Sequence, residues 1–373
     1  MKHVKFENLF QFQKKSKIKA GDGLKLFEGK YPFYTSSDTL TKSINEYLFD
    51  NESLIFGTGG QASIHYCNEK FAVSTDCFVT QPKNSKEVFL KYIYYYLSGN
   101  IYILENGFKG AGLKHISKNY LQNIQIPLPP LPQQQKIANI LDAADAIRQN
   151  DKALIAKYDE LTQALFLDMF GDPVSNPKGW DIDILGNYCK KIQIGPFGSQ
   201  LHMSDYVEEG IPLINPTNIK NGIIEYKSSV KITLSKYDSL PNYHLKIGDV
   251  VMARRGDLSK IGIVDKVKSF CGTGSLYLRL KENIDAVYCY WLLSHKSTVE
   301  KLYEKSQGVT MANLNKGIIV KLPIVVPPLK LQKEFVNRIF LVEEQKAIAQ
   351  KSLEKSEELF NSLLQKAFKG ELV

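Results

Sequence analysis

Two long stretches of the chain carry apolar residues at helical spacing. Residues 133 to 169 contain neither proline nor glycine, and their apolar positions mostly step by three or four: Ile137, Leu141, Ala144, Ile155, Tyr158, Leu161, Leu165 and Met169. The same spacing returns later in the chain, at Phe335, Ile339, Val342, Leu353, Leu359, Leu363 and Ala367. This pattern predicts two long amphipathic helices, which end near Gly171 and Gly370.

Each predicted helix begins in a copy of one phrase. "PPLPQQQKIANIL" occupies residues 129–141, and "PPLKLQKEFVNRI" occupies residues 327–339, so that the offset is 327 − 129 = 198 residues. The offset persists outside the phrase, since Lys118 falls on Lys316 and Phe170 on Phe368. Two copies are too few for a solenoid. The repeat therefore indicates one duplicated unit and a pseudo-two-fold molecule.

The predicted helices are too long for one small domain to bury. Thirty-seven residues span about 55 Å at 1.5 Å per residue, and each apolar stripe needs a partner. We expect the two helices to pair antiparallel as a coiled coil, although a single helix surrounded by solvent is the open alternative. The residues expected in this packing are Ile137, Leu141, Leu161, Leu165, Phe335, Ile339, Leu359 and Leu363.

The remaining sequence forms two blocks with mixed patterns. "SLIFGT", "FAVSTDCFVT" and "NIQIPL" predict strands in the first block, and "GDVVMARRG", "SLYLRL" and "VKLPIVV" predict strands in the second. "KEVFLKYIYYYLSG" and "VYCYWLLSHKSTVEKLYEKS" predict helices. The fold class is α+β, with two pseudo-two-fold-related α/β domains separated by the antiparallel helices. The expected segments are residues 1–128, 129–171, 172–325 and 326–373.

Composition narrows the cellular setting. No stretch approaches the roughly 20 apolar residues of a membrane span, and the polar start "MKHVKFENLF" lacks a signal peptide's apolar core. Five cysteines without a CxxC pair indicate neither a disulfide framework nor zinc, and the six histidines show no repeated ligand spacing. We expect a cytoplasmic protein with reduced, mostly buried thiols and without metal or cofactor.

The excess positive charge lies in the two blocks. Residues 1–128 hold 16 Lys against 11 acids (16 − 11 = +5), and residues 171–325 hold 20 Lys and Arg against 15 acids (20 − 15 = +5). The stretches between and after them hold 12 basic residues against 13 acids (12 − 13 = −1). Basic domains joined by neutral connectors suit a polyanionic ligand, and ordinary solubility charge is the alternative.

Several motifs together resemble those of a known family. Each block closes with an "IPLPPL"-like phrase followed by a "QQQKIANIL"-like helix start, and the second opens with "W…LG…GPFGS…DY…GIP". On these residues the chain resembles a type I restriction-modification specificity subunit over essentially its whole length. The first block lacks the "GPFGS" segment.

The resemblance carries expectations about function. It implies that each domain reads one half of a bipartite double-stranded DNA target. It also implies that the paired helices act as a spacer and dock two DNA methyltransferase subunits, to which a translocating endonuclease subunit can be added. The basic blocks and the duplicated helices fit such an arrangement.

The alternative that the chain is an enzyme requires a catalytic motif. An amino-methyltransferase needs a Gly-rich donor loop and an "NPPY"-like tetrapeptide, and the nearest fragments are "FGTGG" and "NPTN". The sequence contains no GxxxxGK(S/T) motif, and "EYK" is a weak nuclease fragment. We therefore expect no intrinsic catalysis. A methyltransferase or nuclease with drifted motifs, and a coiled-coil scaffold that binds no DNA, stay open as rivals.

Candidate DNA contacts come from two loops and one domain opening. "ARRGDLSKIG" (253–262) places Arg254 and Arg255 in a Gly-containing turn, where arginine can bind guanine or phosphate. "KGAGLKHISK" (109–118) and "QGVTMANLNK" (307–316) match at the 198-residue offset and precede the last strand of each block. Their candidates are Lys109, Lys114, Thr310, Asn313 and Asn315. Turn capping is the alternative for the asparagines. Weaker candidates are Ser199, Gln200 and Asn218.

Overall fold

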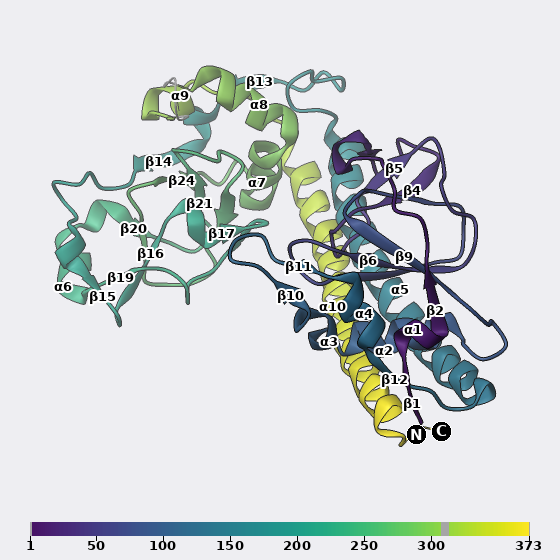
Figure 1. Cartoon of the computed structure of the whole chain (residues 1–373). Coiled ribbons are helices and arrows are strands. Elements are labelled where there is room, and N and C mark those ends of the chain that lie inside the picture. Colours follow the sequence, from purple (N-terminus) through teal and green to yellow (C-terminus); the bar gives the residue numbers. More distant parts are fainter. Residues whose placement is uncertain (1, 307–312, 373) are drawn as a thin grey trace. The chain divides into compact units, whose positions relative to one another are not determined.

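The chain forms two compact units. The computed structural model describes residues 2–306 and 313–372, and Figure 1 shows them as a ribbon. The first unit comprises Met1–Leu154 and Ile348–Val373, and the second comprises Ile155–Ala347. Each unit therefore contains one globular part and half of each long helix. The four predicted segments divide the chain differently, because the long helices pack into the cores of the globular parts.

The first unit contains two four-stranded sheets among its described residues. One is antiparallel, in the order β2-β9-β6-β7, and the other has the order β3-β5-β4-β8 with β4 and β8 parallel. Their bounds are β2 Phe10–Phe12, β9 Cys77–Pro82, β6 Ser53–Gly57, β7 Ile64–Cys67, β3 Leu24–Lys25, β5 Lys42–Ile44, β4 Tyr31–Tyr34 and β8 Ala72–Val73. Two strand pairs complete the unit: β1 His3–Lys5 with β12 Gln125–Pro127, and β10 Phe108–Lys109 with β11 His115–Ile116. The helices are α1 Phe6–Leu9, η1 Ala20–Asp22, α2 Leu90–Gly99, α3 Tyr102–Glu105 and α4 Lys118–Asn123.

The second unit repeats this plan with a larger second sheet. Its antiparallel sheet has the order β14-β24-β21-β22, and its other sheet has the order β15-β19-β16-β23-β20 with β16 and β23 parallel. Their bounds are β14 Cys189–Ile194, β24 Ser275–Leu280, β21 Val250–Ala253, β22 Ile261–Ile263, β15 Tyr206–Val207, β19 Lys231–Ile232, β16 Ile211–Ile214, β23 Ser269–Cys271 and β20 His244–Leu245. The strand pairs are β13 Ile182–Ile184 with β25 Pro323–Val325, and β17 Ile219–Lys220 with β18 Ile223–Ile224. The helices are η2 Leu185–Tyr188, η3 Met203–Asp205, η4 Pro216–Asn218, α6 Leu234–Ser239, η5 Pro241–Tyr243, α7 Ala286–Ser294, α8 Lys296–Lys305 and α9 Lys316–Val320.

The expected strands are present, whereas one expected helix is broken. β6 and β12 lie in the predicted segments of the first block, and β21, β24 and β25 lie in those of the second. The segment "FAVSTDCFVT" (71–80), predicted as one strand, contains β8 and most of β9. The helix predicted over 287–306 is instead α7 followed by α8. The break lies at His295, whose backbone is extended (φ −62°, ψ 138°). The apolar pattern continues across this residue, so periodicity alone did not reveal it.

A buried glutamine explains the repeated phrase in the first unit. Gln134 is fully buried. Its side-chain amide donates to the carbonyl oxygens of Pro129 at 2.8 Å and Glu87 at 2.9 Å, and it accepts from the backbone N–H of Phe89 at 2.9 Å. One side chain thus joins the proline turn to the segment that leads into α2. The side-chain amide nitrogen thus makes two hydrogen bonds and the amide oxygen makes one, so this buried group is satisfied within the unit.

The second unit repeats this arrangement at the same offset. Gln332 is fully buried, donates to the Pro327 carbonyl at 2.8 Å and accepts from Asp285 N–H at 2.9 Å. A tyrosine hydroxyl also holds the last strand in both units. Tyr92 donates to the Pro127 carbonyl, and the matching Tyr288 donates to the carbonyl of Val325, at 2.9 and 2.8 Å.

The long helices are α5 (Leu131–Phe170, 40 residues) and α10 (Leu329–Lys369, 41 residues). Each spans about 60 Å at 1.5 Å per residue. In the first unit, Ser356 donates to Asp151 at 2.8 Å, and the Arg148 guanidinium lies 4.3 Å from the Phe360 ring centroid. In the second unit, Lys346 pairs with Asp159. Along these contacts the residue numbers increase on α5 while they decrease on α10, so the two helices run antiparallel.

Six of the eight residues expected between the helices are buried or partly buried. In the first unit these are Ile137 and Leu141, with Leu363 partly buried, and in the second unit Phe335 and Ile339, with Leu165 partly buried. The expectation fails at Leu161 and Leu359, which are each 47% exposed. The next residues, Thr162 and Phe360, are 2% and 7% exposed and take the inward positions. One residue is about 100° around a helix, so the two leucines face outward.

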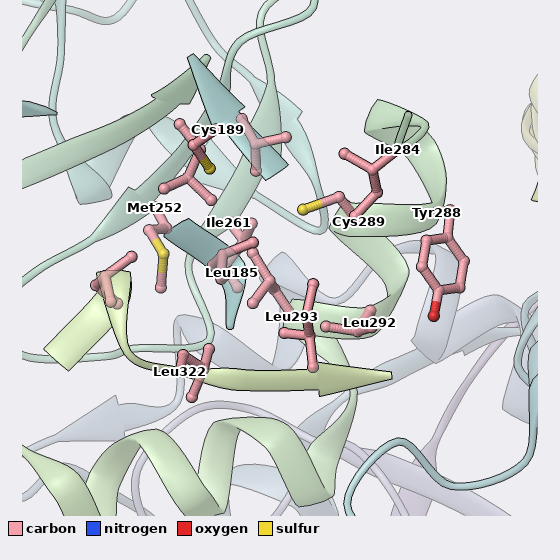
Figure 2. Close-up of a cluster of buried hydrophobic side chains, with 14 of the residues drawn as sticks. Leu185, Cys189, Met252, Ile261, Ile284, Tyr288, Cys289, Leu292, Leu293 and Leu322 are labelled. Carbon is pink, nitrogen blue, oxygen red and sulfur yellow. The ribbon is translucent and has the colours of Figure 1, made fainter. Parts of the chain in front are cut away.

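The cores combine sheet, short helices and the ends of the long helices. In the second unit the main core draws Met252 from β21, Ile261 from β22 and Leu293 from α7 into one cluster, part of which Figure 2 shows.

All five cysteines are unpaired and buried, as predicted. Among the described residues, no helix combines the length and the apolar character needed to cross a bilayer.

Candidate nucleic-acid interface

The strongest sequence candidates lie where β21 ends. This central strand of the antiparallel sheet is completely buried, and the chain leaves it through Arg254 and Arg255. Gly256 has φ 74°, in the left-handed region that favours glycine, and so permits the turn. The backbone at Arg254 is fixed on both sides. Its N–H donates to the Gly274 carbonyl at 3.0 Å, and its carbonyl accepts from Leu314 N–H at 2.8 Å.

The Arg254 side chain is buried, and no ion pair joins it to an acid among residues 2–306 and 313–372. It is 6% exposed, and among the described residues its Nε has no hydrogen-bond partner. Its guanidinium carbon lies 5.7 Å from the ring centroid of Phe197, which is 60% exposed. Burial lowers the pKa of the Arg254 guanidinium, and the charge of Arg255 lowers it further. An unpaired buried cation is costly, so this group favours an incoming acceptor or anion.

Arg255 and the segment before α9 lie together. The exposed Arg255 forms an isolated antiparallel bridge with Asn313. The Asn313 Oδ1 atom is buried and has no hydrogen-bond partner in the described part of the chain. Asn315 instead accepts from Ile318 N–H at 2.9 Å as the N-cap of α9, so the capping alternative holds for this side chain. Thr310 lies outside the described residues.

The opening of the second domain contributes less than its sequence suggested. Ser199 and Gln200 are exposed, and the Gln200 Oε1 atom accepts from the Tyr243 hydroxyl at 2.6 Å. Asn218 is 5% exposed, and its Oδ1 accepts from Asn215 N–H at 3.0 Å. Asn218 closes the short helix η4 and offers its side chain to the protein's own backbone, so it is a poor candidate for DNA contact.

The first-domain candidates lie on the β10–β11 hairpin. Lys109 ends β10, Lys114 precedes β11, and both side chains are exposed. The Lys114 carbonyl accepts from Gly60 N–H at 3.1 Å, which fixes the hairpin against the turn after β6. Exposed lysines on such a hairpin suit phosphate contacts, which position a protein on DNA without reading its sequence.

Phe197 was not among the residues predicted to contact DNA. It lies in the "GPFGS" phrase, which carried only the family resemblance. An exposed aromatic residue between two glycine-containing turns was the available signal. No cluster of three or more metal-ligating side chains occurs within residues 2–306 and 313–372.

Comparison with known proteins gives one consistent result. The type I restriction modification DNA specificity domain matches residues 1–157 and again residues 180–358. The type I restriction enzyme MjaVIII specificity subunit of Methanocaldococcus jannaschii is 23% identical, over 92% of this chain and 87% of its own length. The EcoDI specificity subunit of Escherichia coli is also 23% identical, over 92% of this chain and 83% of its own length.

Solved structures show the same fold. The crystal structure of a type I restriction-modification S subunit from M. genitalium superposes with a TM-score of 0.62 at 18% identity, covering 98% of this chain and 95% of that one. A structure from a study of type I system assembly gives 0.58 at 16% identity, covering 100% of this chain and 98% of that one. Because its domain matches twice and covers most of the residues, the chain belongs to the family of type I restriction-modification DNA specificity subunits, which recognise DNA and are not catalytic.

Proposed function

We propose that this chain selects a bipartite DNA sequence for a type I restriction-modification complex, with one half-site read by each domain. The observation that carries the proposal is the double match to the DNA specificity domain. Two similarly built units, each with its own antiparallel sheet, support it. The chain supplies recognition, and catalysis belongs to its partner subunits.

Charge supports double-stranded DNA as the ligand of both domains. Residues 1–128 and 171–325 each carry a formal charge of +5 (16 − 11 and 20 − 15). If about six phosphates are neutralised in all, log affinity falls with log salt at a slope near −5. Lys109, Lys114 and Arg255 are exposed and suit this backbone contact.

The long helices are proposed to dock two methyltransferase subunits and to set the gap between half-sites. Leu161 and Leu359 support two equivalent contacts, because these residues are 198 positions apart and are equally exposed at 47%. An outward leucine at matched positions of two helices suits two copies of one partner. A translocating endonuclease subunit would join the same complex.

Sequencing of methylated bases tests the proposal. Cells that express the chain with its methyltransferase partner should methylate one bipartite sequence, and cells with either protein alone should not. Replacing residues 1–128 by the equivalent domain of a relative should change one half of the target only. Methyl transfer by the purified chain alone, or a salt-independent affinity for duplex DNA, would contradict the proposal.

A further inference from the structure

The end of β21 and the segment before α9 form a junction with unusual side chains. Arg255 bridges Asn313, and Leu314 N–H donates to the Arg254 carbonyl at 2.8 Å. We call Arg254, Arg255 and Asn313 the second-unit junction. All three lie on backbone that is fixed by these contacts, so their side chains project from a rigid frame rather than from a free loop.

The first unit builds the same junction with different residues. Gly59 forms an isolated antiparallel bridge with His115, and Ile116 N–H donates to the Thr58 carbonyl at 3.1 Å. These contacts correspond one by one to those of the second unit. Thr58, Gly59 and His115, which we call the first-unit junction, therefore stand where the second unit has its two arginines and asparagine. The frame is kept while every side chain differs.

Unsatisfied polar atoms gather at the second-unit junction. Four buried side-chain atoms lack a hydrogen-bond partner among the described residues, and two of them are Arg254 Nε and Asn313 Oδ1. Buried polar groups are nearly always hydrogen-bonded in native proteins. Arg254 and Asn313 lie on the two segments that these backbone contacts join, so two of the exceptions fall at the junction and indicate that a ligand supplies the missing partners.

The chemistry of these atoms distinguishes a base from a phosphate. The guanidinium only donates, while Asn313 Oδ1 only accepts. Phosphate oxygens could satisfy the arginine but not the amide oxygen, whereas the edges of base pairs in the major groove carry acceptors and donors side by side. Guanine O6 and N7 suit arginine in particular. The exposed Phe197 ring, 5.7 Å from the guanidinium, is the group that the DNA would displace to reach it.

The first-unit junction offers a different pattern to the DNA. The His115 Nδ1 atom lies 3.1 Å from the Thr58 carbonyl oxygen, and since a carbonyl only accepts, Nδ1 carries the hydrogen and Nε2 of the neutral ring is an acceptor. A Cβ on Gly59 would lie 3.0 Å from this ring, so glycine leaves room for it. His115 thus offers an exposed acceptor at the position of Asn313, and Thr58 offers no guanidinium at the position of Arg254, so the first-unit junction would select a different base.

We propose, on the basis of the DNA recognition proposed above, that these two junctions are the base-reading sites. Arg254 and Asn313 read a guanine-containing step of one half-site. His115, held by Thr58, reads a base that offers a donor in the other half-site. The two domains then read different sequences because their junctions have the same backbone contacts but carry different side chains.

The test is methylated-base sequencing with the full chain and its methyltransferase partner. Arg254→Gln, Arg254→Lys and Asn313→Ala should each relax or change the second half-site and leave the first unchanged. His115→Ala should do the reverse. Lys227→Gln is the matched control, because it removes one exposed charge from the second unit and should leave the methylated sequence unchanged. Arg254→Lys keeps the charge but loses the two-pronged donor, so an altered sequence assigns the effect to recognition geometry.

Duplex binding separates a base contact from a phosphate contact. Arg254→Lys should weaken binding to the wild-type target about ten- to a hundred-fold, with little change for an unrelated duplex. Equal loss on both duplexes, with Arg254→Gln lowering the salt slope by about one, would identify a phosphate contact and overturn the inference. Unchanged half-sites in folded Arg254→Lys, Asn313→Ala and His115→Ala variants would also overturn it. The proposed function would fail separately, if the wild-type protein itself directed no bipartite methylation.

Discussion

The first and second units use different side chains to join two matching strands, β6 and β9 in the first unit and β21 and β24 in the second. In the second unit, Arg279 on β24 forms an ion pair with Asp249 at the start of β21, with N···O 2.7 Å, and the carboxylate is 2% exposed. At the matching positions of β9 and β6, the first unit has Gln81, which donates to the Ser53 hydroxyl at 3.2 Å. The strand register is preserved, while a charged pair replaces a neutral one.

This difference shows which contacts define the duplicated frame. Glutamine and tyrosine bonds to backbone carbonyls are retained in both units, because the acceptor is main chain and is present whatever the sequence. The compared pair between two side chains differs at both of its positions. The frame therefore depends on side chain-to-backbone bonds, and the side chains placed on it are free to diverge.

The largest effect is expected in the cores beside the long helices. Phe335 is fully buried, with ring centroids of Phe166 and Phe170 at 5.7 and 5.2 Å. Phe335→Ala should cost about 4 kcal/mol of unfolding free energy in the second unit, and Ile137→Ala, at the matching position, about 3 kcal/mol in the first. Hydrogen exchange measured for each unit in urea would resolve the two. Phe340→Ala, at a 63% exposed position, is the control. Loss of protection in the opposite unit would contradict the division into units.

The next largest effect is expected from breaking the side-chain pair that joins the two matching strands, which should cost the second unit more stability than the first. Asp249→Asn should destabilise the second unit by about 3 kcal/mol, because it leaves Arg279 partly buried without its counter-ion. Ser53→Ala should cost the first unit about 1 kcal/mol. Chemical denaturation followed by hydrogen exchange would compare them. Glu300→Gln, whose partner Lys296 is exposed, should have little effect. Equal losses for the two variants would mean that the charge adds nothing.

The repeated glutamines should give matched losses. Gln134→Ala and Gln332→Ala should each destabilise their own unit by about 2 kcal/mol, because each leaves buried backbone groups without partners. Gln135→Ala, an exposed neighbour, serves as the control in the same experiment. If one substitution were harmless, the repeated phrase would have a structural role in only one unit.

The smallest effect concerns acidification. Burial lowers the pKa of His65 in the first unit and of His295 in the second, so both favour the neutral ring when folded. The unfolded state then binds more protons, and this contribution to stability is complete above about pH 6.5 and is lost as the pH falls. His65→Gln and His295→Gln should each reduce the acid sensitivity of its own unit, measured by urea denaturation at pH 7.5 and 5.5. The exposed His3→Gln should not.

Periodicity predicted the repeated architecture but not which side of a helix turn is buried. The apolar pattern favoured Leu161, whereas Thr162 is the buried residue. Its hydroxyl donates to the Asp159 carbonyl at 2.8 Å, so a polar side chain is satisfied inside the packing. A hydrophobicity pattern contains no information about such a bond, which exists only once the helix has formed.

At the candidate interface, residue type was enough to single out the two arginines, but only the fold shows that they differ in solvent exposure. Arg254 and Arg255 are adjacent and chemically identical in the sequence, yet one is 6% exposed and the other exposed. The backbone of Arg254 is held by Gly274 and Leu314, which come from distant parts of the chain. The bond from Asn215 N–H to Asn218 Oδ1 was likewise not visible in the composition.

The two segments that make up the first unit determine when that unit can finish folding during synthesis. Its residues come from both ends of the chain, Met1–Leu154 and Ile348–Val373, whereas the second unit is continuous. Phe360 and Ala367, near the C-terminus, lie in the core of the first unit. Domains fold as units while the ribosome elongates the chain. The domain that is translated first can therefore be completed only after the second, when the last turns of α10 leave the ribosome and fill its core.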